Sequence, residues 1–424
     1  MTKARKNRSR LVLALFAAIL AISTSCGIIE APVAELRTDV PQMALYAAAF
    51  NTSQSRYRIN VTWNEHVASS ISEPGAKPAL VIGRYLKNSR SKSTLQSLDH
   101  LFSDLVINQS SFYPSLLELG SSDGRQMLLP VSFNLPLVVF RRELDDAMSD
   151  GFILDLAELE KLGAAQNKAN KSSFTNMGFG PRWSPEFLYS TISLLGAGFK
   201  EGTPLKWNRT GLEEGIAYIK AWADRSNGSA AKEDEFQFKY LYLPGYKSVE
   251  EGRIGYAAMI SSSYFVVSEE RRSSLSFRWL AKDGAVPVDD DIVYAGICRG
   301  GSGKQAAEAF LKWFYSEETQ RSILDEAKRY RSMESSFGIA GGFSSIRTVN
   351  EKLFPLYYPS LLGKMPPAHY LKPPDILPSM WPELRREIVL PLLLEATGPN
   401  PLANPNAELE ARIQAWLKKM PTNQ

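Results

Sequence analysis

The sequence predicts an α/β protein in which short strands alternate with amphipathic helices around mainly parallel sheets. The first observation is this alternation, with strand-like segments at 60–63, 79–82 and 135–140 and helix-like segments at 43–50, 212–223 and 305–315. The second observation is size. About 400 residues follow an N-terminal leader, and 44% of the chain is hydrophobic, so the chain can bury a large core and favours two domains over one.

Residues 1–25 have the composition of an export signal. Five basic residues and no acidic residue precede an apolar run at 11–22 that is too short for a comfortable membrane-spanning helix. The segment Ser-Thr-Ser-Cys-Gly at 23–27 follows and resembles the lipobox of bacterial lipoproteins, with Ser23 where an aliphatic residue is usual. We expect cleavage after residue 25, acylation of Cys26 and an extracytoplasmic location anchored to a bacterial membrane, with an uncleaved anchor as the alternative.

The charge balance changes when the leader is removed. The full chain has 49 basic and 45 acidic residues, and the five basic residues of the leader reduce the basic count to 44. A nearly neutral mature chain gives no general electrostatic reason to bind nucleic acid or an acidic membrane surface. Once Cys26 is acylated, Cys298 is the remaining cysteine, so an internal disulfide is excluded and the core alone must hold the fold.

The segment 296–315 places a glycine-rich turn before a strongly amphipathic helical pattern and invites comparison with a phosphate-binding loop. Two defining positions fail, because Gln305 stands where that loop needs Ser or Thr and Cys298 stands where it needs its first Gly. We therefore interpret the segment as scaffold. Its glycines are expected to form a strand-to-helix turn, and Ser302 is expected to cap the helix.

Motifs for catalysis and for metal binding are scarce. The three histidines are scattered, and no metal-spaced cysteine set is present. The segment 196–202 mimics a dinucleotide fingerprint but follows a helical pattern, so a helix C-cap and turn is predicted there. The acidic run 289–291 is predicted to be a solvated turn, since no further ligands accompany it at metal-binding spacing. We expect no cofactor, no metal and no enzymatic activity.

Three other segments have the composition of irregular structure. The polar runs at 163–173 and 224–235 are predicted to be surface loops. Residues 355–382 are crowded with Pro and Gly, which break helices and suggest an extended path across a surface. None of the three is interpreted as a domain linker.

Several segments, in order along the chain, resemble the extracellular solute-binding proteins of bacterial ABC importers, in particular the carbohydrate-binding family that includes maltose-binding protein. These segments are 36–50, RINVTWNEH at 58–66, PALVIGRY at 78–85, 124–144, EEGRIGYAAMISSSYF at 250–265 and AAEAFLKWFYSEETQ at 306–320. The sequence departs from the family at Ala79, where the family usually has Asp, and at 140–142, where Phe-Arg-Arg replaces Tyr-Asn-Lys.

The resemblance implies two Rossmann-like lobes joined by crossing strands, of the type II periplasmic-binding-protein kind, with ligand in the cleft between them. The expected division is 27–140 plus 262–330 for the first lobe and 141–261 plus 331–424 for the second. The resemblance also implies a monomer that passes its ligand to the permease subunits of an ABC transporter.

A sugar offers hydroxyl groups on its rim and apolar patches on its faces, so its site needs planar polar groups and aromatic rings. The residues that match the family's ligand-binding positions are Asn134, Trp183, Phe187, Tyr264, Trp381 and Arg385. Three more candidates end predicted strands, where open α/β sheets bind ligands: Trp63, Arg84 and Tyr85. For Tyr264 the alternative is packing beside the hinge, and for Trp63 the favoured alternative is the core.

The leading hypothesis is a lipid-anchored extracytoplasmic protein that captures a small solute, most plausibly a sugar or oligosaccharide, for an ABC importer. Two alternatives stay open. A secreted glycoside hydrolase would need only two carboxylates, which leave no local trace in sequence. A surface lipoprotein that kept the fold but lost transport, such as an adhesin or a sensor subunit, would fit the departures at 79 and 140–142.

Overall fold

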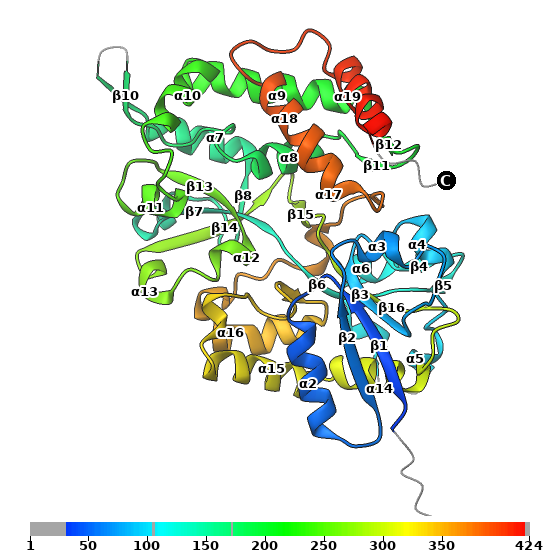
Figure 1. Cartoon of the computed structure of the whole chain (residues 1–424). Helices are drawn as coiled ribbons and strands as arrows, with labels where there is room; N and C mark the ends of the chain where they lie inside the picture. Colours follow the sequence, from blue (N-terminus) through cyan, green and yellow to red (C-terminus); the bar gives the residue numbers. More distant parts are fainter. Residues whose placement is uncertain (1–30, 104–106, 171–172, 420–424) are drawn as a thin grey trace, which may run out of the picture.

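A computed structural model of the chain describes residues 31–103, 107–170 and 173–419, which form an α/β fold of two lobes, one above the other in Figure 1. The expected leader at 1–25 and the acylation site Cys26 lie outside the described residues. Within the described ranges, no helix combines the length and the apolar character that a membrane crossing needs.

The first lobe is built on a six-stranded sheet in the order β17-β6-β16-β3-β1-β2. Its strands are β1 (Val33–Thr38), β2 (Arg58–Trp63), β3 (Leu80–Arg84), β6 (Leu129–Phe133), β16 (Val293–Ile297) and β17 (Phe343–Ser344). Its helices are α2 (Met43–Ser53), α3 (Val67–Ser70), α4 (Ser89–Ser93), α5 (His100–Ser103), α6 (Pro114–Leu119), α14 (Lys304–Phe314), α15 (Glu317–Arg329) and α16 (Phe354–Tyr357). Figure 1 shows this lobe below the second one.

The second lobe contains a four-stranded sheet in the order β13-β7-β14-β8. Its strands are β7 (Pro136–Arg141), β8 (Ile153–Asp155), β13 (Tyr256–Ile260) and β14 (Leu275–Ala281). Its helices are α7 (Leu156–Ala165), α8 (Pro185–Leu194), α9 (Arg209–Asn227), α10 (Ala230–Phe238), α11 (Gly245–Glu250), α12 (Ser261–Tyr264), α13 (Glu269–Arg272), α17 (Trp381–Leu384), α18 (Leu390–Ala396) and α19 (Pro405–Lys419). A π-helical turn, Arg385–Val389, joins α17 to α18.

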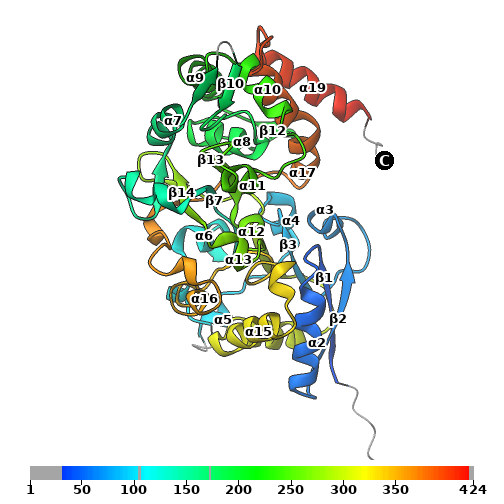
Figure 2. The same cartoon turned by 90° about the vertical axis from the view of Figure 1, so that its left-hand side faces the viewer.

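Short 3-10 helices at Gln109–Ser111, Arg142–Ala147, Ser332–Glu334, Pro359–Leu361 and Ala368–Tyr370, a π-helical turn at Val349–Leu353 and four small two-stranded sheets complete the described chain. The two-stranded sheets are β4–β5 (Ser121–Ser122 and Arg125–Gln126), β9–β10 (Lys168–Asn170 and Ser173–Asn176), β11–β12 (Lys200–Glu201 and Leu205–Lys206) and β15–β18 (Val286–Pro287 and Leu371–Lys372). The side view in Figure 2 shows α7, α8, α9, α10 and α19 on the side of the smaller sheet that faces away from the first lobe.

The prediction of mainly parallel sheets was wrong. In the larger sheet β1 pairs in parallel with β2 and β3, but β16 is antiparallel to β3 and β6, and β17 is antiparallel to β6. The smaller sheet has one parallel pair, β14 with β8. Two of the reversed strands, β7 and β16, are those by which the chain enters a lobe from the other one, and each runs against the neighbouring strands β13 and β14 or β3 and β6.

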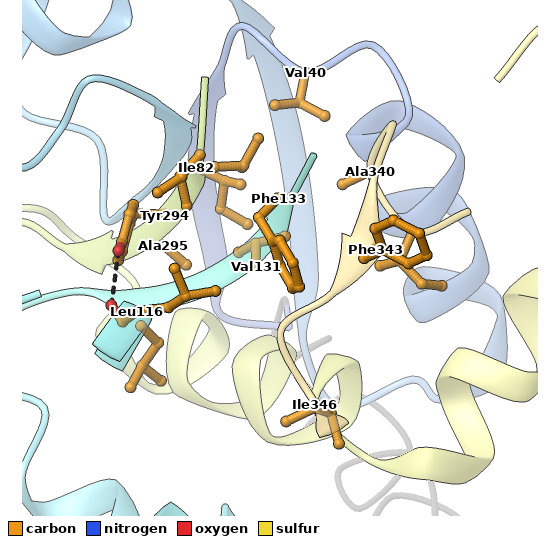
Figure 3. Close-up of a cluster of buried hydrophobic side chains, with 14 of the residues drawn as sticks. Val40, Ile82, Leu116, Val131, Phe133, Tyr294, Ala295, Ala340, Phe343 and Ile346 are labelled. Carbon is orange, nitrogen blue, oxygen red and sulfur yellow. Dashed lines mark hydrogen bonds between the residues drawn. The ribbon is translucent and has the colours of Figure 1, made fainter. Parts of the chain in front are cut away.

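The core of the first lobe packs aromatic rings between the larger sheet and its helices (Figure 3). Phe133 and Phe343 sit on paired strands with ring centroids 5.8 Å apart. The buried Tyr294 hydroxyl donates a hydrogen bond to the carbonyl oxygen of Leu116 at 2.7 Å, so its polar end is satisfied inside the core.

Sheet membership divides the chain differently from the expected lobe boundaries. Strand β7 belongs to the smaller sheet although most of it lies in 27–140, and β14 belongs there although it lies in 262–330. Strand β17 belongs to the larger sheet although it lies in 331–424. We propose that these strands mark the true crossings, since sequence similarity located the segments without locating the points where the chain changes lobe.

The expected strands and helices at 43–50, 60–63, 79–82, 135–140, 212–223 and 305–315 all appear, most of them longer than predicted. The expected cap at Ser302 was wrong. The N-cap of α14 is Gly303, whose φ of 81° is left-handed, and no side chain caps this helix. A Cβ at Gly303 would lie 2.0 Å from the carbonyl oxygen of Val33, so close packing on β1 requires glycine here.

The two polar segments predicted as loops are largely regular. Residues 163–165 end α7, and residues 168–170 form β9. Residues 224–227 end α9, and α10 begins at Ala230 after a left-handed turn at Gly228. Surface helices carry polar side chains as loops do, and here that similarity concealed the helices. The predicted turn at 196–202 is present and follows the end of α8, with left-handed Gly196 and Gly198.

Candidate functional site

The carboxyl ends of β1 and β3 face the second lobe and carry the first charged pair of the site. Asp39 follows β1, and Arg84 ends β3. The Arg84 guanidinium donates to the Asp39 carbonyl oxygen at 3.2 Å and lies 3.7 Å from its carboxylate. Burial raises the pKa of Asp39 to about 6, although Arg84 acts in the opposite direction.

The acidic run 289–291 lies at the same edge of the larger sheet. It precedes β16, and because β16 is antiparallel to β3, with Val293 opposite Arg84, the start of β16 meets the end of β3. The prediction of a solvated turn was therefore wrong. The Asp290 side chain is 1% exposed, and the strand direction that buries it is a long-range property of the sheet.

Asp290 contacts three residues that the sequence had singled out. The indole N–H of Trp381 donates to Oδ2 of Asp290 at 2.6 Å, and the Tyr85 hydroxyl donates to Oδ1 at 3.4 Å. The Arg385 guanidinium lies 3.6 Å from Oδ2. Asp290 thus joins a strand end of the first lobe to the helical segment of the second lobe that begins with Trp381.

Arg385 is held by several groups at once. Its guanidinium forms an ion pair with Glu186 at the start of α8 and lies 4.6 Å from the ring centroid of Tyr189. Burial favours loss of its proton, but Asp290, Asp289 and Glu186 outweigh that effect and raise the pKa of Arg385. The guanidinium is therefore charged and fixed in position.

Trp381 is an anchor of this cluster, with no exposed ring face. It is fully buried, and its ring packs against Tyr189 and Phe199 in the core of the second lobe. Only its N–H reaches the polar cluster, through Asp290. A stacking role for Trp381 therefore stays a prediction that would require this ring to become uncovered.

Acidic groups outnumber basic groups around Asp290. The carboxylates are Asp39, Glu186, Asp289, Asp290 and Asp291, and the cations are Arg84, Lys87 and Arg385. Burial raises the pKa of Glu186, Asp289 and Asp291, and for both aspartates a neighbouring aspartate adds to the effect. Burial also lowers the pKa of Lys87 to about 8. Among the described residues no three His, Cys, Asp or Glu side chains are arranged to hold a metal ion.

Three buried polar atoms in the cluster have no hydrogen-bond partner among the described residues. They are Nζ of Lys87, Oδ1 of Asp291 and Nε of Arg385. A buried donor or acceptor without a partner costs about 1–3 kcal/mol. A hydroxylated ligand could supply partners for such atoms, because each sugar hydroxyl both donates and accepts.

Asn134 follows β6 and lies at this same edge, but its side chain ties protein segments together. Its amide nitrogen donates to the carbonyl oxygen of Gly341 at 3.2 Å, and its amide oxygen accepts from the Ser261 hydroxyl at 2.7 Å. Its backbone carbonyl accepts from the N–H of Asp289 at 2.9 Å. Asn134 thus orients the acidic run at the point where the chain passes between sheets.

Three predicted ligand residues, Tyr264, Phe187 and Trp183, pack away from Asp290, and the first two are buried. Tyr264 is 1% exposed, and its ring contacts Arg272 and Phe277. Phe187 is a core residue whose ring lies 4.8 Å from Phe179.

Trp183 is half-buried and stacks on Phe236, with its indole N–H bound to the backbone of Glu233. The structure does not bring it, Phe187 or Tyr264 together with the polar cluster. We therefore leave these three out of the candidate site.

Trp63, unlike these three residues, has an exposed side chain. The favoured alternative placed it in the core, and the structure contradicts this, because the side chain at the end of β2 is 57% exposed. The end of β2 lies beside the ends of β1 and β3 in the parallel part of the larger sheet. Trp63 is thus an exposed aromatic ring at the edge that carries Arg84.

Side chains of the two lobes also touch beside this cluster. The backbone N–H and hydroxyl of Ser89 donate to the Glu201 carboxylate at 3.0 Å and 2.8 Å. His66 lies 3.3 Å from the carboxylate of Glu383, in the turn that contains Trp381. These contacts, together with Tyr85 and Asp290, connect the walls of the two lobes.

Two cavities lie elsewhere on the molecule. One, of about 350 Å³, is lined by residues of the β11–β12 hairpin and α19, and the other, of about 610 Å³, is lined by residues around α6. Neither contains Asp290 or its partners, so the candidate site rests on the side-chain contacts described above.

The fold is similar to solved structures of sugar-binding proteins. The sugar-binding protein MalE from Xanthomonas citri has a TM-score of 0.64 and 12% identity, with 92% of this chain and all of that chain covered. A sugar transporter from Rhizobium etli in an open conformation has a TM-score of 0.60 and 13% identity, with 91% and 100% covered. The cyclic alpha-maltosyl-1,6-maltose binding protein from Arthrobacter globiformis has a TM-score of 0.59 and 15% identity, with 91% and 98% covered.

These likenesses establish the type II periplasmic-binding-protein fold that the sequence resemblance predicted. At the level of sequence, no family model and no curated protein matches this chain.

Sequence reasoning missed six members of the cluster: Asp39, Lys87, Glu186, Asp289, Asp290 and Asp291. Asp39 carried a usable signal, because it directly follows the first predicted strand and parallel strands present their carboxyl ends at one edge. The sequence signal for Glu186 was weaker, since it consisted only of a position next to a predicted helix start. The role of Asp290 depends on an antiparallel strand that the sequence did not predict.

Proposed function

We propose that this chain is a lipid-anchored extracytoplasmic binding protein that captures a sugar or oligosaccharide between its lobes and delivers it to the permease of an ABC importer. The observation that carries the proposal is the cluster around Asp290. It combines a strand end of one lobe, a helical segment of the other and the segment that connects them. A solute bound there would contact both lobes at once.

The chemistry of the cluster suits a neutral, hydroxyl-rich solute. Carboxylates accept hydrogen bonds from sugar hydroxyls, and the guanidinium groups of Arg84 and Arg385 donate to them in fixed planar geometry. Trp63 offers an exposed ring at the rim, where a sugar face can stack. Structures similar to this fold include proteins solved with mannotriose and with maltotriose bound, which supports the choice of ligand class.

Capture would work by a shift between two arrangements of the lobes. A ligand that contacts both walls stabilises the arrangement in which the walls are close, since only there are all of its contacts made. Ser89 and Glu201 would then contribute a hydrogen bond between the lobes, and neither residue belongs to the cluster that binds the ligand. In our proposal the permease recognises this closed arrangement.

Calorimetric titration with a panel of gluco- and manno-oligosaccharides tests the capture step. We expect micromolar or tighter binding of at least one member, roughly −8 kcal/mol or better. Mass spectrometry of solute released from freshly purified, denatured protein would identify the natural ligand without a panel. Failure of every oligosaccharide to bind, combined with a released solute that is not a sugar, would refute the proposed ligand class.

The lipid anchor and the enzyme alternative have separate tests. Metabolic labelling with a fatty-acid analogue should label the wild-type protein, and Cys26→Ser should abolish the label. Chromogenic glycosides should not be turned over by purified protein, and turnover would instead favour a hydrolase. Co-purification with permease subunits in the presence of ligand tests the transport partner, and its absence would favour an adhesin or sensor subunit.

A further inference from the structure

The cavity of about 350 Å³ on the second lobe is separate from the Asp290 cluster. It lies between the β11–β12 hairpin and helix α19, which Figure 1 places side by side at the upper right. Its lining includes the polar and aromatic side chains of Lys200, Lys206, Trp207, Arg209, Glu410 and Gln414. The volume falls within the range of about 300–1,000 Å³ that is typical of small-molecule sites.

The charges around this cavity are unbalanced. Lys200 and Lys206 are directly opposite each other in the antiparallel hairpin. Like charges in that position destabilise a strand pair, because their side chains leave the sheet close together. Arg209 adds a third cation, and the Glu410 carboxylate, 2.6 Å from its guanidinium, is the sole acidic group in the lining. An anion placed in the cavity would relieve the repulsion between the two lysines.

An aromatic ring with fixed orientation lies beside these cations. The indole N–H of Trp207 donates to Oδ1 of Asn406 at 2.7 Å, and Asn406 is itself buried and bound to Glu213 at 2.6 Å. The Arg209 guanidinium lies 5.5 Å from the Trp207 ring centroid. Trp207 is therefore held by a network that does not depend on any ligand, as a pre-organised binding surface requires.

We propose that this cavity binds a small anionic saccharide, meaning a sugar ring that carries a carboxylate or phosphate group. Lys200 and Lys206 bind the anionic group, and Trp207 with Gln414 contacts the sugar ring. Cations next to a fixed aromatic ring favour this ligand over an inorganic anion, which would use the lysines alone, and over a neutral sugar, which would leave them unpaired. The site is independent of capture between the lobes.

Calorimetric titration of the full-length protein with glucuronate, glucose 6-phosphate, glucose and inorganic phosphate tests this site. We expect the two anionic sugars to bind more tightly than glucose or phosphate, and to bind more weakly as salt is added. The double substitution Lys200→Gln and Lys206→Gln should lower their affinity at least tenfold. Because it removes a like-charge pair, the variant should fold at least as well as the wild type, which thermal unfolding checks.

Matched controls separate this site from the site between the lobes. Lys161→Gln removes an exposed lysine of α7 on another part of the second lobe and should leave the anionic sugars' affinity unchanged. Arg385→Gln should also leave it unchanged, and the lysine double variant should leave neutral oligosaccharide binding unchanged. Equal binding of glucose, equal binding of phosphate, or an anionic-sugar affinity that is insensitive to the double substitution would each overturn the proposal.

Discussion

The indole N–H of Trp381 donates a 2.6 Å hydrogen bond to Oδ2 of Asp290, 91 positions away in the chain. This bond links the segment that connects the two sheets to the helical part of the second lobe. Both partners are buried, with Trp381 fully covered and Asp290 1% exposed. The same carboxylate accepts from Tyr85 of the first lobe, so one side chain holds three parts of the fold together.

Substitution of Asp290 should therefore reduce the free energy of unfolding, and alanine should reduce it more than asparagine does. Asp290→Ala leaves the Trp381 N–H without its acceptor and Arg385 with one carboxylate fewer, and we expect a loss of about 2–4 kcal/mol. Asp290→Asn keeps an acceptor oxygen and relieves repulsion from Asp289 and Asp291, so its loss should be about 1 kcal/mol or less. Urea unfolding measures both values, and equal losses would contradict the role of the hydrogen bond.

Substitution of Arg385 should lower ligand affinity far more than substitution of Arg386, its neighbour in sequence. Arg385→Gln removes a charged donor at the centre of the cluster, and we expect at least a tenfold loss of oligosaccharide affinity, or about 1.4 kcal/mol. Arg386 is the matched control, since its side chain is 70% exposed and, among the described residues, its ion pair is with Glu387. Titration calorimetry compares the two, and similar effects from both variants would count against the site.

Trp63 should contribute to binding without contributing to stability. Its ring is exposed, so Trp63→Ala should change the free energy of unfolding by no more than about 0.5 kcal/mol. Loss of a stacking surface should weaken oligosaccharide binding by roughly 1 kcal/mol. Tyr242→Ala removes another exposed ring, 96% accessible and outside the cluster, and should leave affinity unchanged. Unaltered affinity in the Trp63 variant would remove this residue from the site.

The raised pKa of Asp39 should make the stability of the fold depend on pH. Its pKa is raised from 3.8 to about 6 in the folded protein, so the unfolded chain loses this proton first as the pH rises. The protonated Asp39 carboxyl stabilises the folded state fully below about pH 4, and this contribution is lost as the pH rises through 6. The free energy of unfolding should fall by about 3 kcal/mol over this range, at 1.4 kcal/mol per pKa unit. Asp39→Asn should flatten the pH profile of urea unfolding in this window, and an unchanged profile would contradict the assignment.

The sequence predicted the fold well where local patterns determine it. The strands around 60–63 and 79–82 and the amphipathic helix at 305–315 follow from period and composition, and the structure contains all three. Polar surface helices were predicted as loops at 224–235 because their composition does not distinguish the two. The expected lobe boundaries stay a prediction, because the points where the chain changes lobe depend on strand pairing over long range, which local patterns do not encode.

The candidate site was also predictable only where local sequence patterns mark its residues. Arg84 and Tyr85 were found because they end a strand, and Arg385 because it matches a motif around Trp381. The acidic run 289–291 was misjudged because a run of three aspartates is usually solvated, and only the antiparallel pairing of β16 with β3 buries it. The placement of Tyr264, Trp183 and Phe187 away from the cluster reflects packing that aromatic composition alone cannot distinguish from ligand contact.

Small-angle X-ray scattering with and without a bound oligosaccharide tests the central claim most directly, because that claim is capture between two lobes. Maltotriose and mannotriose are suitable first ligands, since proteins of similar fold were solved with them. We predict a smaller radius of gyration at saturating ligand for the wild type and no change for Arg385→Gln at the same concentration. Binding without any compaction in the wild type would contradict capture between the lobes.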